Sequence, residues 1–141
     1  MIIPDTNLLL YAHLDAMPQH PAANAWWNEV MNGQEAIGLC WPVITGFIRI
    51  ATNRRVFAAP LAPDVAMNVC DSWLTGNMVR LVEPGPRHMH LLRQFLRQTP
   101  GGDLVTDAHI AAIAAEYNAT VHSNDTDFRR FSGIKWVNPL R

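Results

Sequence analysis

The chain has 141 residues, 49% of them hydrophobic and 16% charged, a balance typical of one folded domain. Its formal net charge of −1 excludes the global basic field that many nucleic-acid binders carry. The first residues lack a basic leader, and no apolar run approaches the ~18 residues of a membrane helix. We therefore expect a cytoplasmic protein with no membrane partner. The two cysteines lie in apolar stretches without a CxxC spacing, which favours buried free thiols.

Short apolar runs alternate along the chain with longer segments of helical composition. Prolines, Asn32-Gly33 and the break at Pro100-Gly101-Gly102 separate them. In chain order, the predicted elements are a strand at 2–3, helices at 8–12 and 22–31, a strand at 36–41, helices at 42–52 and 64–74, a strand at 79–82, helices at 86–98 and 107–117, and strands at 120–122 and 135–137. This alternation predicts an α/β fold with a mostly parallel sheet covered on both faces, formed as a single domain by residues 1–141.

Aspartates follow several of the predicted strands. Asp5 comes directly after the first strand, Asp107 opens a helix for which Thr106 is the predicted N-cap, and Asp125 and Asp127 follow the strand at 120–122. Ligands of parallel α/β sheets bind beyond the carboxyl ends of the strands, so these sequence-distant acids can meet in one crevice. Carboxylates brought together either take up protons or hold a cation, and carboxylate oxygens suit Mg²⁺ or Mn²⁺.

Each acid also has a purely structural interpretation. Asp5 could cap the first helix, for which Thr6-Asn7 offers a second possible cap. Asp107 could complement the dipole of its helix, and Asp125 with Asp127 could form an Asx-turn. Taken singly, each structural role is the commoner one. The joint placement of the acids after strands is what favours a metal-dependent reaction on a phosphodiester.

The same residues resemble the ordered motifs of PIN-domain ribonucleases. These motifs are Pro4-Asp5-Thr6-Asn7 near the start, Thr106-Asp107-Ala108 at the head of an alanine-rich helix, and Ser123-Asn124-Asp125-Thr126-Asp127-Phe128 near the end. The likeness covers essentially the whole chain and is closest to the VapC toxins of bacterial toxin–antitoxin pairs.

The resemblance implies a fold, an activity and partners. It implies a five-stranded sheet of order 3-2-1-4-5 and an endoribonuclease that depends on Mg²⁺ or Mn²⁺. It also implies inhibition by a VapB-type antitoxin, frequent homodimerisation, and structured substrates such as transfer RNA. Carried across, Asp5 and Asp107 are the main metal ligands and Asp125 completes the acidic site. Asp127 lies beside them, with Thr6 and Ser123 as polar neighbours.

One motif residue of the resembled family is missing. The family places a glutamate near the middle of the helix at 42–52, where this chain has Gly46. The loss of one negative charge should weaken metal binding or move a ligand elsewhere. Asp103, four residues before Asp107, is a candidate substitute, and a solvated loop position is the equally weighted alternative. A degenerate PIN domain that binds RNA or an antitoxin without cutting is therefore the rival function.

Ten of the eleven basic residues in this sequence are arginines. Arginine forms bidentate contacts with phosphate. Arg49 lies on the helix that carries Gly46, and Arg129 and Arg130 flank the acidic loop. These three are candidates for contacts to RNA phosphates. Trp26 and Trp27 are expected to provide core together with a partly exposed surface, and a dimer or antitoxin interface is the alternative.

Overall fold

The computed structural model describes all residues, 1–141, as one five-stranded parallel sheet with helices on both faces. The strand order is β3-β2-β1-β4-β5, as the resemblance to PIN domains implied. The strands are β1 (Ile2–Pro4), β2 (Ile37–Leu39), β3 (Val79–Leu81), β4 (Thr120–His122) and β5 (Lys135–Val137). The helices are α1 (Thr6–His13), α2 (His20–Met31), α3 (Trp41–Ala51), α4 (Pro63–Leu74), α5 (His88–Leu96) and α6 (Val105–Glu116), with 3-10 turns η1 (Gly102–Leu104) and η2 (Thr126–Arg130).

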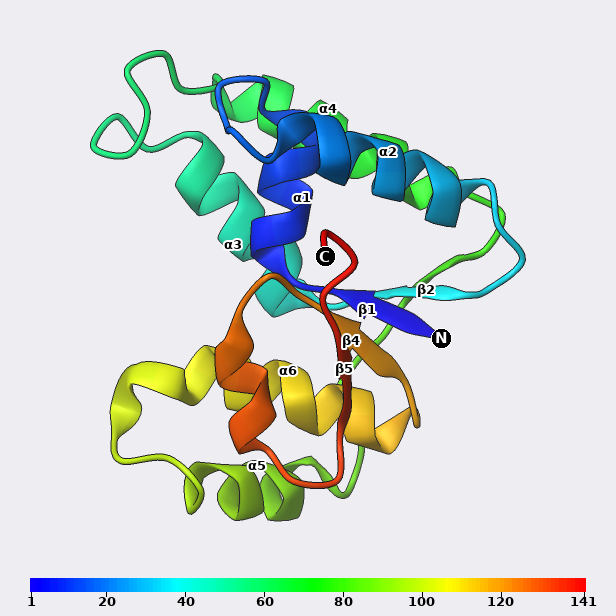
Figure 1. The fold of residues 1–141 in the computed structure, drawn as a ribbon, viewed down its shortest axis with the longest axis vertical. Coiled ribbons are helices and arrows are strands. Elements are labelled where there is room, and N and C mark those ends of the chain that lie inside the picture. The colour runs from blue at the N-terminus through cyan, green and yellow to red at the C-terminus, as the bar shows by residue number, and fades with distance from the viewer.

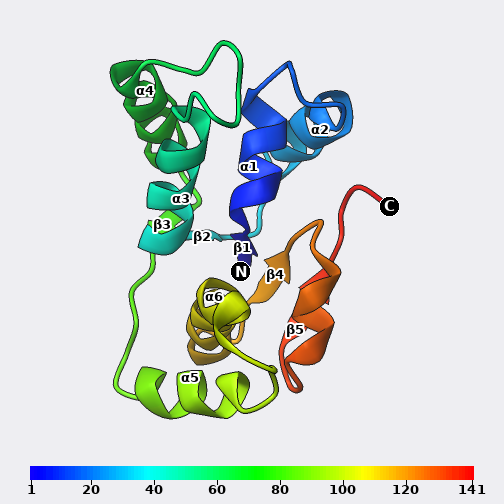
Figure 2. The same ribbon diagram turned by 90° about the vertical axis from the view of Figure 1, so that its left-hand side faces the viewer.

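The helices form two groups on opposite sides of the sheet. Helices α1 to α4 lie on one side, and α5 and α6 lie on the other (Figures 1 and 2). The central strands are buried on both faces, and Ile3 and Val121 have no exposed surface. Burial on both faces explains why these strands read in the sequence as continuous apolar runs instead of alternating patterns. No helix of the chain has the length and apolar character needed to cross a membrane.

Aromatic residues fill the core between α1, α2, α3 and α4. Trp73 is 1% exposed, its ring centroid lies 4.9 Å from that of Phe47, and its indole nitrogen donates to Nε2 of His13 at 3.0 Å. Trp26 and Trp27 are buried in the same core, so their core interpretation is confirmed and the interface alternative is wrong. Both cysteines are free and buried, as predicted.

All six predicted helix starts are wrong by one or two residues, and those of α1 and α6 bear on the site. Helix α1 begins at Thr6 and is capped by Asp5, whose carboxylate accepts from the Thr6 amide at 2.8 Å. Helix α6 begins at Val105 with Leu104 at its N-cap, so Thr106 lies inside the first turn. The 3-10 turn η1 ends at Leu104 and α6 begins at the next residue. The chain is therefore already helical at Thr106, which cannot act as the N-cap.

Candidate acidic active site

Asp5 is fixed at the centre of the sheet. It follows β1, and only 6% of the residue is exposed. Oδ1 caps α1, while Oδ2 accepts from the Ser123 hydroxyl at 2.7 Å and from the Asn7 side-chain amide at 3.1 Å. Burial raises the pKa of Asp5, and the hydrogen bonds from Ser123 and Thr6 oppose that shift. The structural and the functional interpretations of Asp5 are therefore compatible, because one side chain caps the helix and faces the site.

Ser123 joins the first motif to the last. The residue has no exposed surface and directly follows β4, the strand paired with β1. Its hydroxyl donates to Asp5 and accepts from the Asp125 amide at 2.9 Å and from Asn7 Nδ2 at 3.2 Å. The Asn124 amide in turn donates to Asn7 Oδ1 at 3.3 Å. This network holds the loop that carries Asp125 against the start of α1.

The other three acids gather beside Asp5. One carboxylate oxygen from each of Asp107, Asp125 and Asp127 lies within 4.8 Å of the other two. Asp107 is in the first turn of α6, and Asp125 caps η2 by accepting from the Asp127 amide at 2.8 Å. Sequence-distant acids from three elements therefore meet at the carboxyl end of the sheet, as their positions after strands predicted.

The electrostatics of this cluster favour a cation. The pKa of Asp107 is raised to about 7, chiefly by burial. The charges of Asp5, Asp125 and Asp127 contribute the rest of the shift. A carboxyl group whose ionised form is disfavoured by like charges is one that a divalent cation would stabilise. Oxygen donors at this spacing fit Mg²⁺ or Mn²⁺, which prefer hard ligands.

A pocket of about 250 Å³ opens in front of Asp5 and Asp107. Helix α3 forms its far wall with Pro42, Gly46, Arg49 and Ile50, and Thr6, Asn7, Leu10 and Thr106 complete the lining. The positively charged Arg49 side chain therefore lines an acidic pocket, and it lies on the helix that carries Gly46, as predicted from the sequence. A phosphate group could lie between this guanidinium and the carboxylates.

Gly46 lines this pocket at the place where the family glutamate is expected. A Cβ atom at Gly46 would lie 2.9 Å from Oγ1 of Thr6. Real Cβ atoms essentially never approach another atom so closely, so Thr6 occupies the space that a longer side chain at position 46 needs. The close contact makes the identities of these two residues interdependent. No sequence pattern shows this, because they are forty positions apart.

Asp103, the candidate substitute for the glutamate, lies elsewhere. It is exposed in η1 and shares a pocket of about 170 Å³ with Asp127 and Arg130, to which α3 contributes no residue. It does not line the pocket of Gly46. This placement favours the alternative of a solvated loop residue.

We accordingly predict that Asp103→Ala keeps Mn²⁺ affinity and RNA cleavage within about threefold of the wild type, as is usual for an exposed charge without a close partner. Asp127→Ala, the matched removal of the neighbouring acid inside the cluster, should weaken both by more than tenfold, on the order of what loss of a metal-site residue costs. Isothermal titration with Mn²⁺ measures the affinity. A tenfold loss in Asp103→Ala would restore its role as a ligand.

The two arginines of the acidic loop are engaged by the chain itself. The Arg129 guanidinium lies over the ring of Trp136, 5.2 Å from its centroid. Arg130 Nε lies 3.6 Å from Asp127 Oδ1, with both side chains about half exposed. Of the three predicted phosphate-binding arginines, only Arg49 lines the pocket in front of Asp5 and Asp107.

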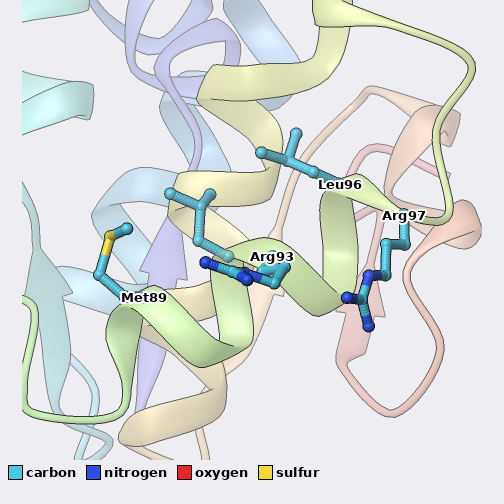
Figure 3. A pocket seen from close by; sticks show the side chains of 5 residues that line it. Met89, Arg93, Leu96 and Arg97 are labelled. Carbon is cyan, nitrogen blue, oxygen red and sulfur yellow. The ribbon is translucent and has the colours of Figure 1, made fainter.

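A separate apolar groove of about 400 Å³ lies on the outer face of α5. Met89, Leu92 and Leu96 line it, with Arg93 and Arg97 at its edge (Figure 3). It contains no carboxylate, so it lacks the chemistry of the acidic cluster.

Comparison with known proteins agrees with this geometry. A profile of the PIN domain matches residues 2–134. Ribonuclease VapC33 of Mycobacterium tuberculosis is 47% identical over 142 aligned residues, covering 100% of this chain and 99% of the relative. This chain belongs to the VapC branch of the PIN-domain family. Ribonuclease VapC37 of the same organism is 36% identical to it, over 99% of this VapC chain and 97% of the relative.

Solved VapC structures have the same fold as this VapC chain. Mycobacterium tuberculosis VapC20, a toxin that cleaves the sarcin–ricin loop, superposes with a TM-score of 0.73 at 16% identity, over 99% of this chain and 100% of its own. The Rickettsia felis VapBC2 complex, bound to a DNA fragment from its promoter, gives a TM-score of 0.69 at 15% identity and covers 98% of each chain. At such low identity these likenesses show the fold of this VapC chain.

Proposed function

We propose that this chain is an endoribonuclease toxin that hydrolyses RNA phosphodiester bonds at the acidic cluster with Mg²⁺ or Mn²⁺. The observation that carries the proposal is the convergence of four acids from three separate parts of the sequence. Asp107, Asp125 and Asp127 form one cluster, and Asp5 lines the same pocket as Asp107. The full-length similarity to ribonuclease VapC33 supports the same activity.

Each residue of the cluster has a proposed role. Asp107 and Asp125 would hold the ion together with Asp5 or Asp127, through their carboxylate oxygens. The bound cation would supply an activated water and charge stabilisation for the leaving oxygen. Ser123 and Thr6 support the site, since Ser123 orients Asp5 and Thr6 closes the gap at Gly46. Arg49 would contact an RNA phosphate and position the strand without reading its sequence.

The proposed partners follow from the family. A ribonuclease that acts freely in the cytoplasm needs an inhibitor, and the solved relatives include VapBC complexes from Rickettsia felis and Haemophilus influenzae. We propose a cognate VapB-type antitoxin, a homodimeric toxin and a structured RNA substrate such as transfer RNA. Co-expression of the chain with its genomic neighbours, followed by purification of the toxin, tests the first of these. Recovery of the toxin alone at full yield and without toxicity would contradict it.

The rival function is a PIN domain that binds RNA without cutting it. Gly46 is the observation that favours it, because the pocket lacks the family glutamate. The raised pKa of Asp107 counts against it, since a site with no cation has no use for four mutually repelling carboxylates.

The deciding experiment is incubation of purified total RNA with the wild-type chain or Asp5→Asn, in Mg²⁺, Mn²⁺ or EDTA. We expect metal-dependent fragments, with a loss on the order of a thousandfold or more in the variant. Asp15→Asn, an exposed aspartate outside the cluster, is the matched control and should cut normally. Intact RNA in every lane, from folded protein free of antitoxin, would favour the binding module.

A further inference from the structure

A second pocket adjoins the acidic cluster, and no residue of α3 lines it. It measures about 370 Å³ and is mostly polar in its lining. The residues that line it are Asn7, Tyr11, Asn124, Asp125, Thr126 and Arg141. We call it the Tyr11 pocket. Its volume is in the range of small-ligand sites, and it is large enough for a nucleobase.

The Tyr11 pocket is continuous with the proposed site of cleavage. It shares Asp125 with the carboxylate cluster and Asn7 with the pocket in front of Asp5. An RNA strand whose scissile phosphate lies at the carboxylates can therefore place its neighbouring nucleotide in the Tyr11 pocket. Arg49 lines the pocket in front of Asp5 and not the Tyr11 pocket, so it remains available to contact another phosphate of the same strand.

Several polar groups in the Tyr11 pocket are free to bind a ligand. The hydroxyls of Tyr11 and Thr126 make no hydrogen bond within the protein, and neither does the side-chain nitrogen Nδ2 of Asn124. Asn124 Oδ1 accepts from Asn138 Nδ2 at 2.9 Å, which fixes the amide plane and leaves its NH₂ group available. The guanidinium of Arg141 forms no ion pair. By contrast, the side-chain NH₂ group of Asn7 already donates hydrogen bonds to Asp5 and Ser123.

Resting on the proposed function, we propose that the Tyr11 pocket binds an unpaired guanine next to the scissile phosphate. The groups that can only donate are the Asn124 NH₂ and the Arg141 guanidinium, and the two hydroxyls can donate as well. Guanine presents two neighbouring acceptors, O6 and N7, whereas adenine presents a donor beside N7. Bases in RNA become accessible on these edges in single-stranded loops, so the substrate class is an RNA with an unpaired guanine at the cut.

The first test is a pair of matched variants. Tyr11→Phe removes one free hydroxyl and keeps the ring. Tyr117→Phe makes the same substitution at the only other tyrosine, whose hydroxyl is hydrogen-bonded to Glu83 outside the site. For total RNA we expect kcat/KM to fall about three- to tenfold in Tyr11→Phe through a higher KM, the effect of one lost hydrogen bond. Mapped cut sites should show guanine beside the cut, with weaker enrichment in Tyr11→Phe. Tyr117→Phe should match the wild type.

The second test does not depend on cleavage. The ¹⁵N-labelled wild-type chain in EDTA is titrated with guanosine 5′-monophosphate and, separately, adenosine 5′-monophosphate. We expect the Asn124 side-chain amide signals to shift with the guanine nucleotide and much less with the adenine nucleotide. Equal shifts, or none, together with cut sites unchanged in Tyr11→Phe, would overturn the guanine pocket while leaving the nuclease intact. A guanine-selective shift in a chain that leaves RNA uncut would uphold the pocket and overturn the nuclease.

Discussion

Asp107→Asn is expected to raise the Tm of the metal-free protein at pH 8 by roughly 3 °C while abolishing RNA cleavage. The pKa of Asp107 is raised to about 7 by burial and by the neighbouring acids, so at pH 8 its charge opposes folding. Because Asp107 is only partly buried, solvent screening reduces the gain to about 1 kcal/mol. The same change removes a proposed cation ligand, so stability and activity should move in opposite directions.

The size of this effect should depend on pH. A carboxyl group with a raised folded-state pKa binds more protons when folded than when unfolded, between its ordinary pKa of 3.8 and about 7. Its destabilising contribution is therefore complete above pH 7 and disappears as the pH falls towards 4. Thermal unfolding in EDTA should show the stabilisation by Asp107→Asn at pH 8 and almost none at pH 4.5.

Asp64→Asn provides the matched control for Asp107→Asn. Asp64 also lies in the first turn of a helix, α4, but is exposed and has no acidic cluster around it. Its charge complements the helix dipole, so its removal should cost about 0.3–1 kcal/mol. Opposite signs for two first-turn aspartates would show that repulsion within the cluster, and not helix position, sets the effect at Asp107. A lower Tm for Asp107→Asn at pH 8 would contradict the electrostatic account.

Strand and helix periodicity predicted the fold class, but periodicity alone could not order the strands. The runs at 120–122 and 135–137 coincide with β4 and β5, because both short strands are bounded by polar loops. The order 3-2-1-4-5 came from the resemblance to PIN domains, since five similar apolar runs carry no record of which pairs with which. Helix starts were less predictable, because Thr106 has a capping side chain yet the chain enters α6 directly from η1.

The acids of the site were predictable, whereas most of what holds them was not. Asp5, Asp107 and Asp125 stand next to strand or helix ends, which is a signal that a sequence contains. The network of Asn7, Ser123 and Asn124 joins residues more than a hundred positions apart. Its uncharged side chains form no charge pattern in the sequence from which their pairing could be predicted. Sequence reasoning singled out Ser123 only through the family resemblance and missed Asn7 as the bridge between the two motifs.

Gly46→Ala is expected to destabilise the protein by about 1 kcal/mol, at the low end of the cost of overpacking. Glycine to alanine inside a helix ordinarily stabilises by about 0.5–1 kcal/mol, so the sign is the informative quantity. Here the new Cβ would lie 2.9 Å from Oγ1 of Thr6, a β-branched side chain with little rotamer freedom. In a Thr6→Ala background that atom is absent, and the same Gly46→Ala change should become stabilising. Chemical denaturation of the four proteins measures the coupling.

Gly46→Glu extends this argument to the missing acid. In the wild-type background we expect a loss of about 1–3 kcal/mol, because the glutamate meets both Thr6 and the carboxylates of Asp5 and Asp107. In the Thr6→Ala background the side chain has room to enter the pocket, and the extra negative charge should strengthen Mn²⁺ binding relative to Thr6→Ala alone. Titration calorimetry measures that affinity. Unchanged affinity, with the double variant folded, would mean that this site forms its cation shell without an acid from α3, and that Thr6 and Gly46 together are an alternative to the family glutamate.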